Sequence, residues 1–287
     1  MIVSRRDFML GAAAFIAVTP TLLHASELSD QLAQLEKQYG GRLGVAIIDT
    51  GSGTQFTHRA DERFGLCSTF KFLAAAAVLH RIDQGLEQLD RQVLYTKADL
   101  IEYAPITEQH VNEGSMALGD LCAAAVELSD NTAGNLLLRT LGGPQGLTKF
   151  MRDLGDDITR MDRMEPTLNI IEPGDPRDTT TPASMLKLMK KLLVEEALHT
   201  SSRKQLQQWM INCKTGTKRV AAGLPADWLI GDKTGTGPKG EANDVAIIWP
   251  PERKPVLVAS YYVGEKNTPE ERNAVHAAIG RLVIENT

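Results

Sequence analysis

Three serine–lysine pairs in the sequence have a spacing that could activate a serine as a nucleophile. A serine hydroxyl attacks poorly unless a base lies beside it, and a lysine three residues later on a helix shares its face. The pairs are Ser68/Lys71, Ser184/Lys187 and Ser201/Lys204. The spacing predicts nucleophilic catalysis, but it does not choose among the three.

The residues around Ser68 favour that pair. Ser68 follows the loop 64–67 and precedes a strongly apolar segment, residues 69–80, so it stands at the start of an expected buried helix. The unpaired N–H groups and positive dipole end of a helix start favour a reaction through an oxyanion. Burial would also make Lys71 more easily neutral. The other two serines begin ordinary amphipathic helices, where a capping or surface role is expected.

Ser129-Asp130-Asn131 occurs once, between two apolar, helix-like segments. A given tripeptide is rare by chance in a chain of this length. The same residues also make a good cluster of helix N-cap residues. Taken alone, the motif leaves a structural and a functional interpretation open.

Lys-Thr-Gly occurs twice. The first copy, residues 214–216, follows a predicted helix in a polar stretch and is interpreted as a helix-ending turn. The second copy ends a predicted strand, where a cation, hydroxyls and bare backbone could meet an anionic ligand; Gly235 lets that backbone come close. Its residues, with the threonine that follows, are Lys233, Thr234, Gly235 and Thr236.

Glu165 and Asn169 lie four residues apart in a long polar stretch. Together they could hold one water, which the carboxylate would activate as a general base. A solvated surface glutamate is the simpler explanation of Glu165 taken alone.

These residues need elements to position them, and apolar spacing predicts both helices and strands. Helices are expected at 28–39, 69–80, 119–128, 133–141, 182–198, 202–211 and 270–284. Strands are expected at 43–48, 55–59, 228–235, 245–249 and 256–263.

Strands lie toward both ends of the chain and helices in its middle, which predicts an α+β fold. Residues 26–60 and 212–287 would form one domain, an antiparallel sheet flanked by the terminal helices. Residues 61–211 would form an inserted all-helical domain. A pocket is expected at the seam between the two.

The composition excludes some partners. The 287 residues are 43% hydrophobic, enough for a real core, and the formal net charge is −5. Such a mildly acidic chain has no general attraction for nucleic acid or anionic lipid.

The first 25 residues resemble a removable twin-arginine export signal. Arg5-Arg6 precedes an apolar run, residues 9–18, with a small residue at Ala25. The run is too short to span a bilayer, although an uncleaved anchor or a chance arginine pair remains an alternative. The signal implies export to the periplasm.

Three cysteines, Cys67, Cys122 and Cys213, are too few for a disulfide framework. Apolar neighbours suggest that Cys122 is a core thiol. One bridge stays possible.

Taken together, the motifs carry a resemblance. Ser-x-x-Lys, Ser-Asp-Asn and Lys-Thr-Gly occur in the order that marks class A β-lactamases and penicillin-binding proteins. From about Leu28 to its C-terminus, the chain resembles the class A serine β-lactamases. Ser68-Thr69-Phe70-Lys71 has a form that the family's nucleophile motif often takes. By the same resemblance Arg163 and Asp178 would pair to close an omega loop, residues 163–178, with a cis bond before Pro166.

The resemblance implies a role for each residue in opening β-lactam antibiotics. Ser68 would form an acyl-enzyme, giving its proton to Lys71 or, through a water, to Glu165. Ser129 would protonate the lactam nitrogen, and Glu165 with Asn169 would hold the hydrolytic water. Backbone N–H groups of Ser68 and Thr236 would form the oxyanion hole.

The remaining roles concern binding and support. Asp130 would be structural and Asn131 would bind the substrate's side-chain amide. The lactam carboxylate would be bound by Lys233, Thr234, Gly235 and Thr236. No cofactor or metal is expected, because the six histidines lack zinc-ligand spacing. The expected ligands are β-lactam antibiotics and mechanism-based inhibitors. The protein is expected to be a monomer.

Some positions depart from the family pattern. Many members carry an arginine on the strand after Lys-Thr-Gly; residues 242–245 have none, and Arg219 lies where a subset supplies it. Cys67 precedes the nucleophile, as in several carbapenemases, but its partner position is Gly237. The partner position for Cys122 is Ala75, so neither family disulfide is expected and carbapenemase activity is unsupported.

Three rivals share parts of this pattern. A penicillin-binding D,D-peptidase would deacylate very slowly, and the Glu165/Asn169 pair argues against it. A β-lactam sensor domain would carry a long transmembrane segment. A glutaminase of related fold would lack both the Glu165 element and the export signal.

Overall fold

The computed structural model describes residues 20–286, with side chains from Leu28 onward. Most of the expected export signal, residues 1–19, lies outside the described residues. Its last part, from Pro20, belongs to helix α1 (Pro20–Tyr39). None of the helices described within residues 20–286 combines the length and apolar character needed to cross a membrane.

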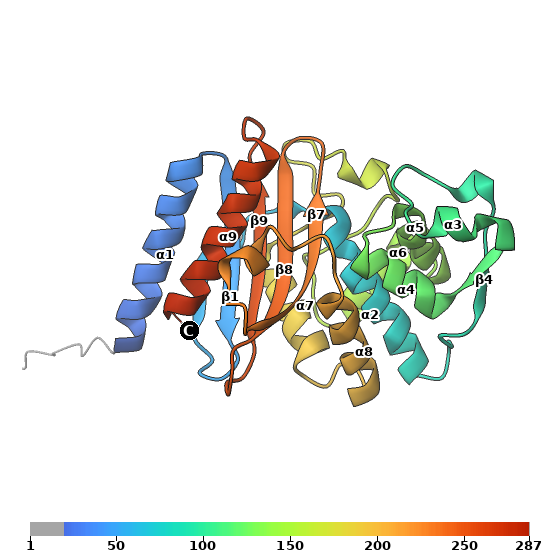
Figure 1. The fold of residues 1–287 in the computed structure, drawn as a ribbon, viewed down its shortest axis with the longest axis horizontal. Coiled ribbons are helices and arrows are strands. Elements are labelled where there is room, and N and C mark those ends of the chain that lie inside the picture. The colour runs from blue at the N-terminus through green and yellow to red at the C-terminus, as the bar shows by residue number, and fades with distance from the viewer. Residues whose placement is uncertain (1–19, 287) are drawn as a thin grey trace, which may run out of the picture.

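An antiparallel sheet of five strands forms the centre of the molecule (Figure 1). Its order is β2-β1-β9-β8-β7, so the strand that carries the second Lys-Thr-Gly motif lies at an edge. The strands are β1 (Arg42–Asp49), β2 (Gln55–His58), β7 (Leu229–Thr236), β8 (Glu241–Trp249) and β9 (Val256–Val263).

Both faces of this sheet are buried. Successive side chains of a strand point to opposite faces. On β1, Val45 and Ile47 belong to a core with residues of α1 and α9 (Pro269–Asn286), whereas Ala46 and Ile48 belong to a core with residues of the other helices. Strand β1 is therefore an almost continuous apolar run, because it must satisfy two cores.

Helices cover the two faces differently. The terminal helices α1 and α9 lie side by side over one face (Figure 1). On the other face, α7 (Pro182–Leu193) contacts β1 and β9, and α8 (Thr200–Ile211) contacts β7.

Helix α2 (Phe70–Asp83) runs through the middle of the helical part, and residues 70–79 are all buried. A helix that is apolar all round belongs in an interior, and α2 contacts α4, α5, α6 and α8. The remaining helices are α3 (Thr107–His110), α4 (Leu118–Glu127), α5 (Asn131–Thr140) and α6 (Pro144–Asp153).

Two pairs of short strands lie within residues 61–211, so this part is mainly helical rather than all-helical. They are β3 (Phe64–Gly65) with β6 (Thr179–Thr180), and β4 (Gln92–Leu94) with β5 (Ser115–Ala117). Strands of two or three residues are too short to show an alternating pattern.

The α+β fold predicted from the sequence is confirmed. Strand β9 occupies the predicted residues, but β8 begins at Glu241 rather than 245, and α7 ends at Leu193 rather than 198. Helix α6 is not among the predicted elements, although Leu147, Phe150 and Met151 have helical spacing there.

The three cysteines are free. Cys122 is a buried core thiol, as predicted, and Cys67 is also buried.

Candidate active site

A cavity of about 350 Å³ brings most of the predicted residues together. It lies where the β7 edge of the sheet meets the helical part of the chain. The side chains around it come from segments far apart in the sequence; they are Ser68, Tyr103, Ser129, Asn131, Glu165, Asn169, Thr215, Arg219, Thr234 and Thr236. Tyr103 and Thr215 are the two that the sequence motifs did not identify.

Ser68 lies in a 3₁₀ turn (Cys67–Thr69) that leads directly into α2. One helical turn later, the Lys71 ammonium donates hydrogen bonds to Ser68 Oγ at 2.9 Å, to the Ser129 carbonyl at 2.8 Å and to Asn131 Oδ1 at 2.6 Å. Lys71 is completely buried. The serine and lysine are therefore in direct contact, as their spacing predicts.

The environment of Lys71 lowers its basicity. Burial lowers the pKa of the ammonium to about 8, and the Glu165 carboxylate, with Oε1 3.5 Å from Lys71 Nζ, opposes that shift. Desolvation disfavours the charged form of a lysine. A larger fraction of Lys71 is then neutral near physiological pH, and a neutral amine can accept a proton from Ser68.

Ser129 lies between two buried lysines. Lys233 Nζ donates to Ser129 Oγ at 3.1 Å, and Lys71 Nζ approaches the same oxygen at 3.5 Å. Ser129 has a φ of +60°, a conformation uncommon outside glycine. Its hydroxyl can receive a proton from one side of the cavity and deliver it to the other.

Asp130 holds the local backbone. Its carboxylate accepts hydrogen bonds from Ala133 N at 2.8 Å, Thr107 N at 2.9 Å and Ile106 N at 3.0 Å. It thereby caps α5 and fixes a neighbouring loop. Next to it, Asn131 is engaged at both ends, with Lys71 and with the Glu102 carbonyl.

Glu165 is held by its backbone and its side chain. Asn135 on α5 pairs with both the N–H and the carbonyl of Glu165, each at 2.9 Å, and Asn169 Nδ2 donates to Glu165 Oε2 at 2.6 Å. Glu165 Oε1 and Asn169 Oδ1 are buried acceptors without a hydrogen bond from the described residues. One water between them could donate to both. The Glu165–Pro166 bond is cis, as the resemblance predicts.

The predicted ion pair that closes the omega loop is present. Arg163 Nε lies 2.5 Å from one oxygen of the wholly buried Asp178, and the other oxygen accepts from the backbone N–H groups of Asp162 and Arg163. The Asp178 carbonyl accepts from Leu66 N at 2.9 Å, just before the Ser68 turn. The loop that carries Glu165 is therefore fastened beside the nucleophile.

The β7 side of the cavity is cationic. Lys233 and Arg219 are both buried, and burial lowers the pKa of each. Arg219 donates to Thr236 Oγ1 at 2.6 Å and to the Gly235 carbonyl at 2.7 Å. Arg219 lines the cavity and Lys233 contacts the lining residue Ser129, so an anionic ligand would meet two cations here. The carboxylates of Asp232 and Asp244 act on both cations but do not line the cavity.

Gly235 makes a close contact within the protein, whereas the sequence predicts its close approach to an anionic ligand. A Cβ at this position would lie 3.0 Å from the Leu66 carbonyl and 3.1 Å from Asn243 Nδ2. The bare backbone of β7 therefore approaches the segment before Ser68, which brings the strand edge beside the nucleophile.

Thr215 and Asn135 were missed for understandable reasons. Thr215 belongs to the first Lys-Thr-Gly copy, which lies in a bend just after α8 rather than in a helix-ending turn, and its hydroxyl lies 2.5 Å from Thr234 Oγ1. Asn135 lies inside an apolar helix, and its contact with Glu165 spans 30 residues. Neither contact leaves a local signal in the sequence.

The other two serine–lysine pairs lie outside the cavity. Ser184 is buried in the first turn of α7 and hydrogen-bonded to Asp156, while Ser201 is exposed in the first turn of α8. Lys187 and Lys204 are both exposed. The expected surface role is confirmed for Ser201 and the two lysines. For Ser184 the expectation of a capping or surface role is wrong, because Thr181 caps α7 and Ser184 is buried against Asp156.

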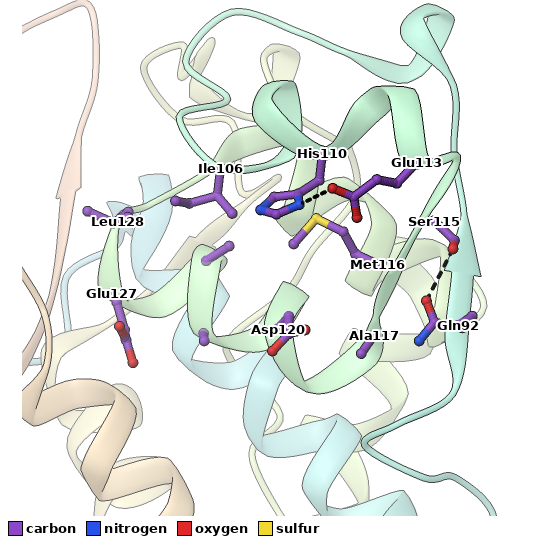
Figure 2. Close-up of a pocket in the computed structure, with 12 residues that line it drawn as sticks. Gln92, Ile106, His110, Glu113, Ser115, Met116, Ala117, Asp120, Glu127 and Leu128 are labelled. Carbon is purple, nitrogen blue, oxygen red and sulfur yellow. Dashed lines mark hydrogen bonds and ion pairs between the residues drawn. The ribbon is translucent and has the colours of Figure 1, made fainter.

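A separate hollow of about 480 Å³ lies in the helical part of the molecule (Figure 2). Ile106 and Met116 line it together with polar side chains such as His110, Glu113 and Glu127. It contains none of the predicted serines or lysines. Within residues 20–286, no three histidine, cysteine, aspartate or glutamate side chains gather as metal ligands would.

Comparison with known proteins places this geometry in context. Residues 27–287 match the model of the "Beta-lactamase enzyme family". The chain is 47% identical to beta-lactamase CTX-M-25 of Escherichia coli, over 98% of this chain and 97% of that protein. It is 44% identical to beta-lactamase AST-1 of Nocardia asteroides, over 94% of this chain and 87% of that protein.

Solved structures show the same similarity. An ancestral (GNCA) class A beta-lactamase aligns with a TM-score of 0.89 at 56% identity, covering 91% of this chain and all of the other. The "Putative Class A Beta-Lactamase PenP from Rhodopseudomonas palustris" aligns with the same TM-score at 49% identity, covering 91% of this chain and all of the other.

Proposed function

Because this chain belongs to the class A β-lactamases, it hydrolyses β-lactam rings and gives resistance to these antibiotics, and we propose that Ser68 carries the reaction. The observation that supports this assignment most directly is the 2.9 Å contact between Lys71 Nζ and Ser68 Oγ. A base in contact with a hydroxyl is the signature of an activated nucleophile.

Acylation begins with attack of Ser68 Oγ on the lactam carbonyl. Lys71 takes the serine proton directly, which its contact and its lowered pKa support. Glu165 acting through a water is the alternative base. The backbone N–H groups of Ser68 and Thr236 stabilise the oxyanion that forms.

Ring opening needs a proton on the lactam nitrogen. Ser129 delivers it, because its hydroxyl lies between Lys71 and Lys233. The proton that left Ser68 can thus return to the substrate through Lys71 and Ser129, without entering bulk solvent. The product of this half-reaction is an ester on Ser68.

Deacylation uses the other side of the cavity. Glu165 and Asn169 hold a water, Glu165 removes its proton, and the resulting hydroxide attacks the ester carbonyl. The bond between that carbon and Ser68 Oγ then breaks, and Ser68 Oγ takes back a proton as the open-ring acid leaves. Glu165 Oε1 and Asn169 Oδ1, which are buried and accept no hydrogen bond from the described residues, support this assignment. The pair also favours a hydrolase over a D,D-peptidase, which would keep the acyl group for much longer.

Substrate binding rests on the cationic edge. Lys233, Thr234, Thr236 and Arg219 bind the lactam carboxylate, helped by the close approach of Gly235, and Asn131 binds the side-chain amide. Penicillins and cephalosporins both carry a carboxylate of this kind, and so do mechanism-based inhibitors, which we expect to acylate Ser68.

The setting of the enzyme is part of the proposal. Residues 1–25 act as a twin-arginine export signal, and the mature chain works in the periplasm as a monomer. Its two parts, residues 26–60 with 212–287 and residues 61–211, are proposed as the domains on either side of the cavity.

Hydrolysis of a chromogenic cephalosporin by the mature protein, with and without EDTA, tests the function. Turnover should be unaffected by EDTA, because serine and lysine supply the chemistry. Ser68→Gly should lower kcat at least about 10³-fold. Ser201→Gly, in an exposed pair of the same spacing, is the matched control and should keep full activity. Substantial turnover by Ser68→Gly would show that the nucleophile is wrong.

A further inference from the structure

Arg219 is a buried cation whose hydrogen bonds all go to neutral oxygens. Its side chain is 7% exposed. The acceptors are Gly235 O at 2.7 Å, Asn243 O at 2.5 Å, Thr236 Oγ1 at 2.6 Å and Asn273 Oδ1 at 3.2 Å. None of these hydrogen bonds goes to a carboxylate, although the charges of Asp244 and Asp232 act on the guanidinium. Arg219 also lines the cavity, where an anionic substrate can reach it.

The backbone that carries Arg219 is held by a carboxylate on β8. The N–H of Val220, the next residue, donates to Asp244 Oδ2 at 3.1 Å. Asp244 is completely buried. Its neighbour Asn243 accepts from the Arg219 guanidinium and donates from its own side chain to the carbonyl groups of Gly65 and Leu66. Asn243 therefore connects Arg219 to the segment before Ser68, and Asp244 holds the residue that follows Arg219.

A buried carboxyl group at this position is costly, and stability does not explain it. Asp244 Oδ1 is buried without a hydrogen-bond partner among the described residues. Burial raises the pKa of Asp244 and the nearby Asp232 raises it further, while Arg219 opposes the shift. An apolar side chain inside the sheet would avoid this cost. An unsatisfied buried polar group in a folded protein calls for another explanation.

We propose that Asp244 is a positioning residue for Arg219: by accepting the Val220 N–H, it fixes the backbone so that the guanidinium lies beside Thr236 and meets the substrate carboxylate. The inference rests on the proposed role of Arg219 in carboxylate binding. It has a specific consequence. Substitution of Asp244 should raise KM for β-lactams with a free carboxylate and should hardly change KM for those without one.

The test compares a chromogenic cephalosporin with its methyl ester, which lacks the anionic group. Asp244→Ala should raise KM for the free acid about tenfold and leave its kcat within about twofold. For the ester, both constants should stay within about twofold. Asp244→Asn should restore a near-normal KM, because its amide oxygen can still accept from Val220 N–H. Asp244→Val, which fills the buried space in the strand, replaces the alanine variant if that protein does not fold.

A double variant shows whether Asp244 acts through Arg219. If it does, Arg219→Ala/Asp244→Ala should have the same KM as Arg219→Ala alone. Independent, multiplying effects would overturn the proposal. So would a rise in KM that is equal for acid and ester, or a lower melting temperature with an unchanged KM, since each indicates a purely structural role.

The outcomes separate the inference from the function on which it rests. If the wild-type protein hydrolyses neither compound, the proposed function fails. If Arg219→Ala leaves KM for the free acid unchanged, the carboxylate-binding role of Arg219 fails, and the positioning role fails with it. If Arg219→Ala raises KM and the Asp244 variants do not, only the positioning role is wrong.

Discussion

At the scale of single residues, Lys71 has a part in two steps of the proposed reaction, the attack of the serine and the opening of the ring. Lys71 contacts Ser68, Ser129 and Asn131 at once, and its Nζ lies 3.5 Å from Glu165. A lysine in water would be charged and unable to act as a base at neutral pH. Burial in α2 changes that, so the apolar sequence after Ser68 is itself part of the chemistry.

The lowered pKa of Lys71 predicts a pH dependence. The neutral amine is the active base, and its fraction rises with pH through the pKa of about 8. The value of kcat/KM should therefore increase from pH 6, reach half its maximum near pH 8 and level off about one pH unit higher, since this constant reports the free enzyme. A rising limb near pH 10, where an ordinary lysine titrates, would contradict a desolvated Lys71.

Glu165 should control deacylation more than acylation. Glu165→Gln keeps the shape and the contact with Asn169 but removes the base. A stable acyl-enzyme should then accumulate, visible by mass spectrometry as one added drug molecule on Ser68. The control is Glu172→Gln, an exposed side chain of the same stretch, which should turn over normally. Fast deacylation by Glu165→Gln would mean that another group activates the water.

At the scale of elements, the omega loop is held by one buried carboxylate. Asp178 pairs with Arg163 and accepts two backbone N–H groups. Asp178→Ala should cost about 3–5 kcal/mol of unfolding free energy, because it leaves a partly buried guanidinium and two N–H groups unpaired. It should also lower kcat by slowing deacylation, as Glu165 loses its fixed position.

Urea unfolding and steady-state kinetics check this prediction. Asp175→Ala is the control in the same loop, because the hydrogen bonds of the Asp175 carboxylate go to the backbone N–H and the exposed side chain of Arg177, two residues away. This control should leave both the unfolding midpoint and kcat nearly unchanged. Equal effects of the two variants would argue that Asp178 has no special role.

The sequence predicted the elements better than it predicted their contacts. Long periodic segments such as α2 and β9 were found, because periodicity is a local property. Helix α6 carries the same signal in a shorter form and was not identified. Ser68, Lys71, Glu165 and the second Lys-Thr-Gly motif were predicted because each stands in a recognisable order. Thr215 was not, because its place depends on how α8 packs against β7.

At the scale of the whole molecule, the central sheet belongs to two cores. Alternate residues of β1, β8 and β9 pack against the terminal helices and against the helical part. Neither part can lose its packing without exposing one face of the shared sheet. The two proposed domains are therefore not expected to be independent folding units, and the whole molecule should unfold in one cooperative transition.

Urea unfolding should show one transition, with the same midpoint by tryptophan fluorescence and by far-UV circular dichroism. Leu137→Ala, in the helical part and fully buried, should lower the unfolding free energy by about 2–5 kcal/mol and shift both midpoints together to lower urea concentration. Two separate midpoints, with only one moved by this substitution, would show that the parts unfold independently.

The short ladder between β3 and β6 has a consequence for adaptation to new drugs. Residues 64–65 lead into the nucleophile and residues 179–180 leave the omega loop, and the two segments are paired. The bond-forming and the hydrolysing machinery thus share one seam. Substitutions that reshape the omega loop for bulkier antibiotics should also displace the paired segment before Ser68. Broader resistance in this protein should therefore lower its turnover of the original drugs.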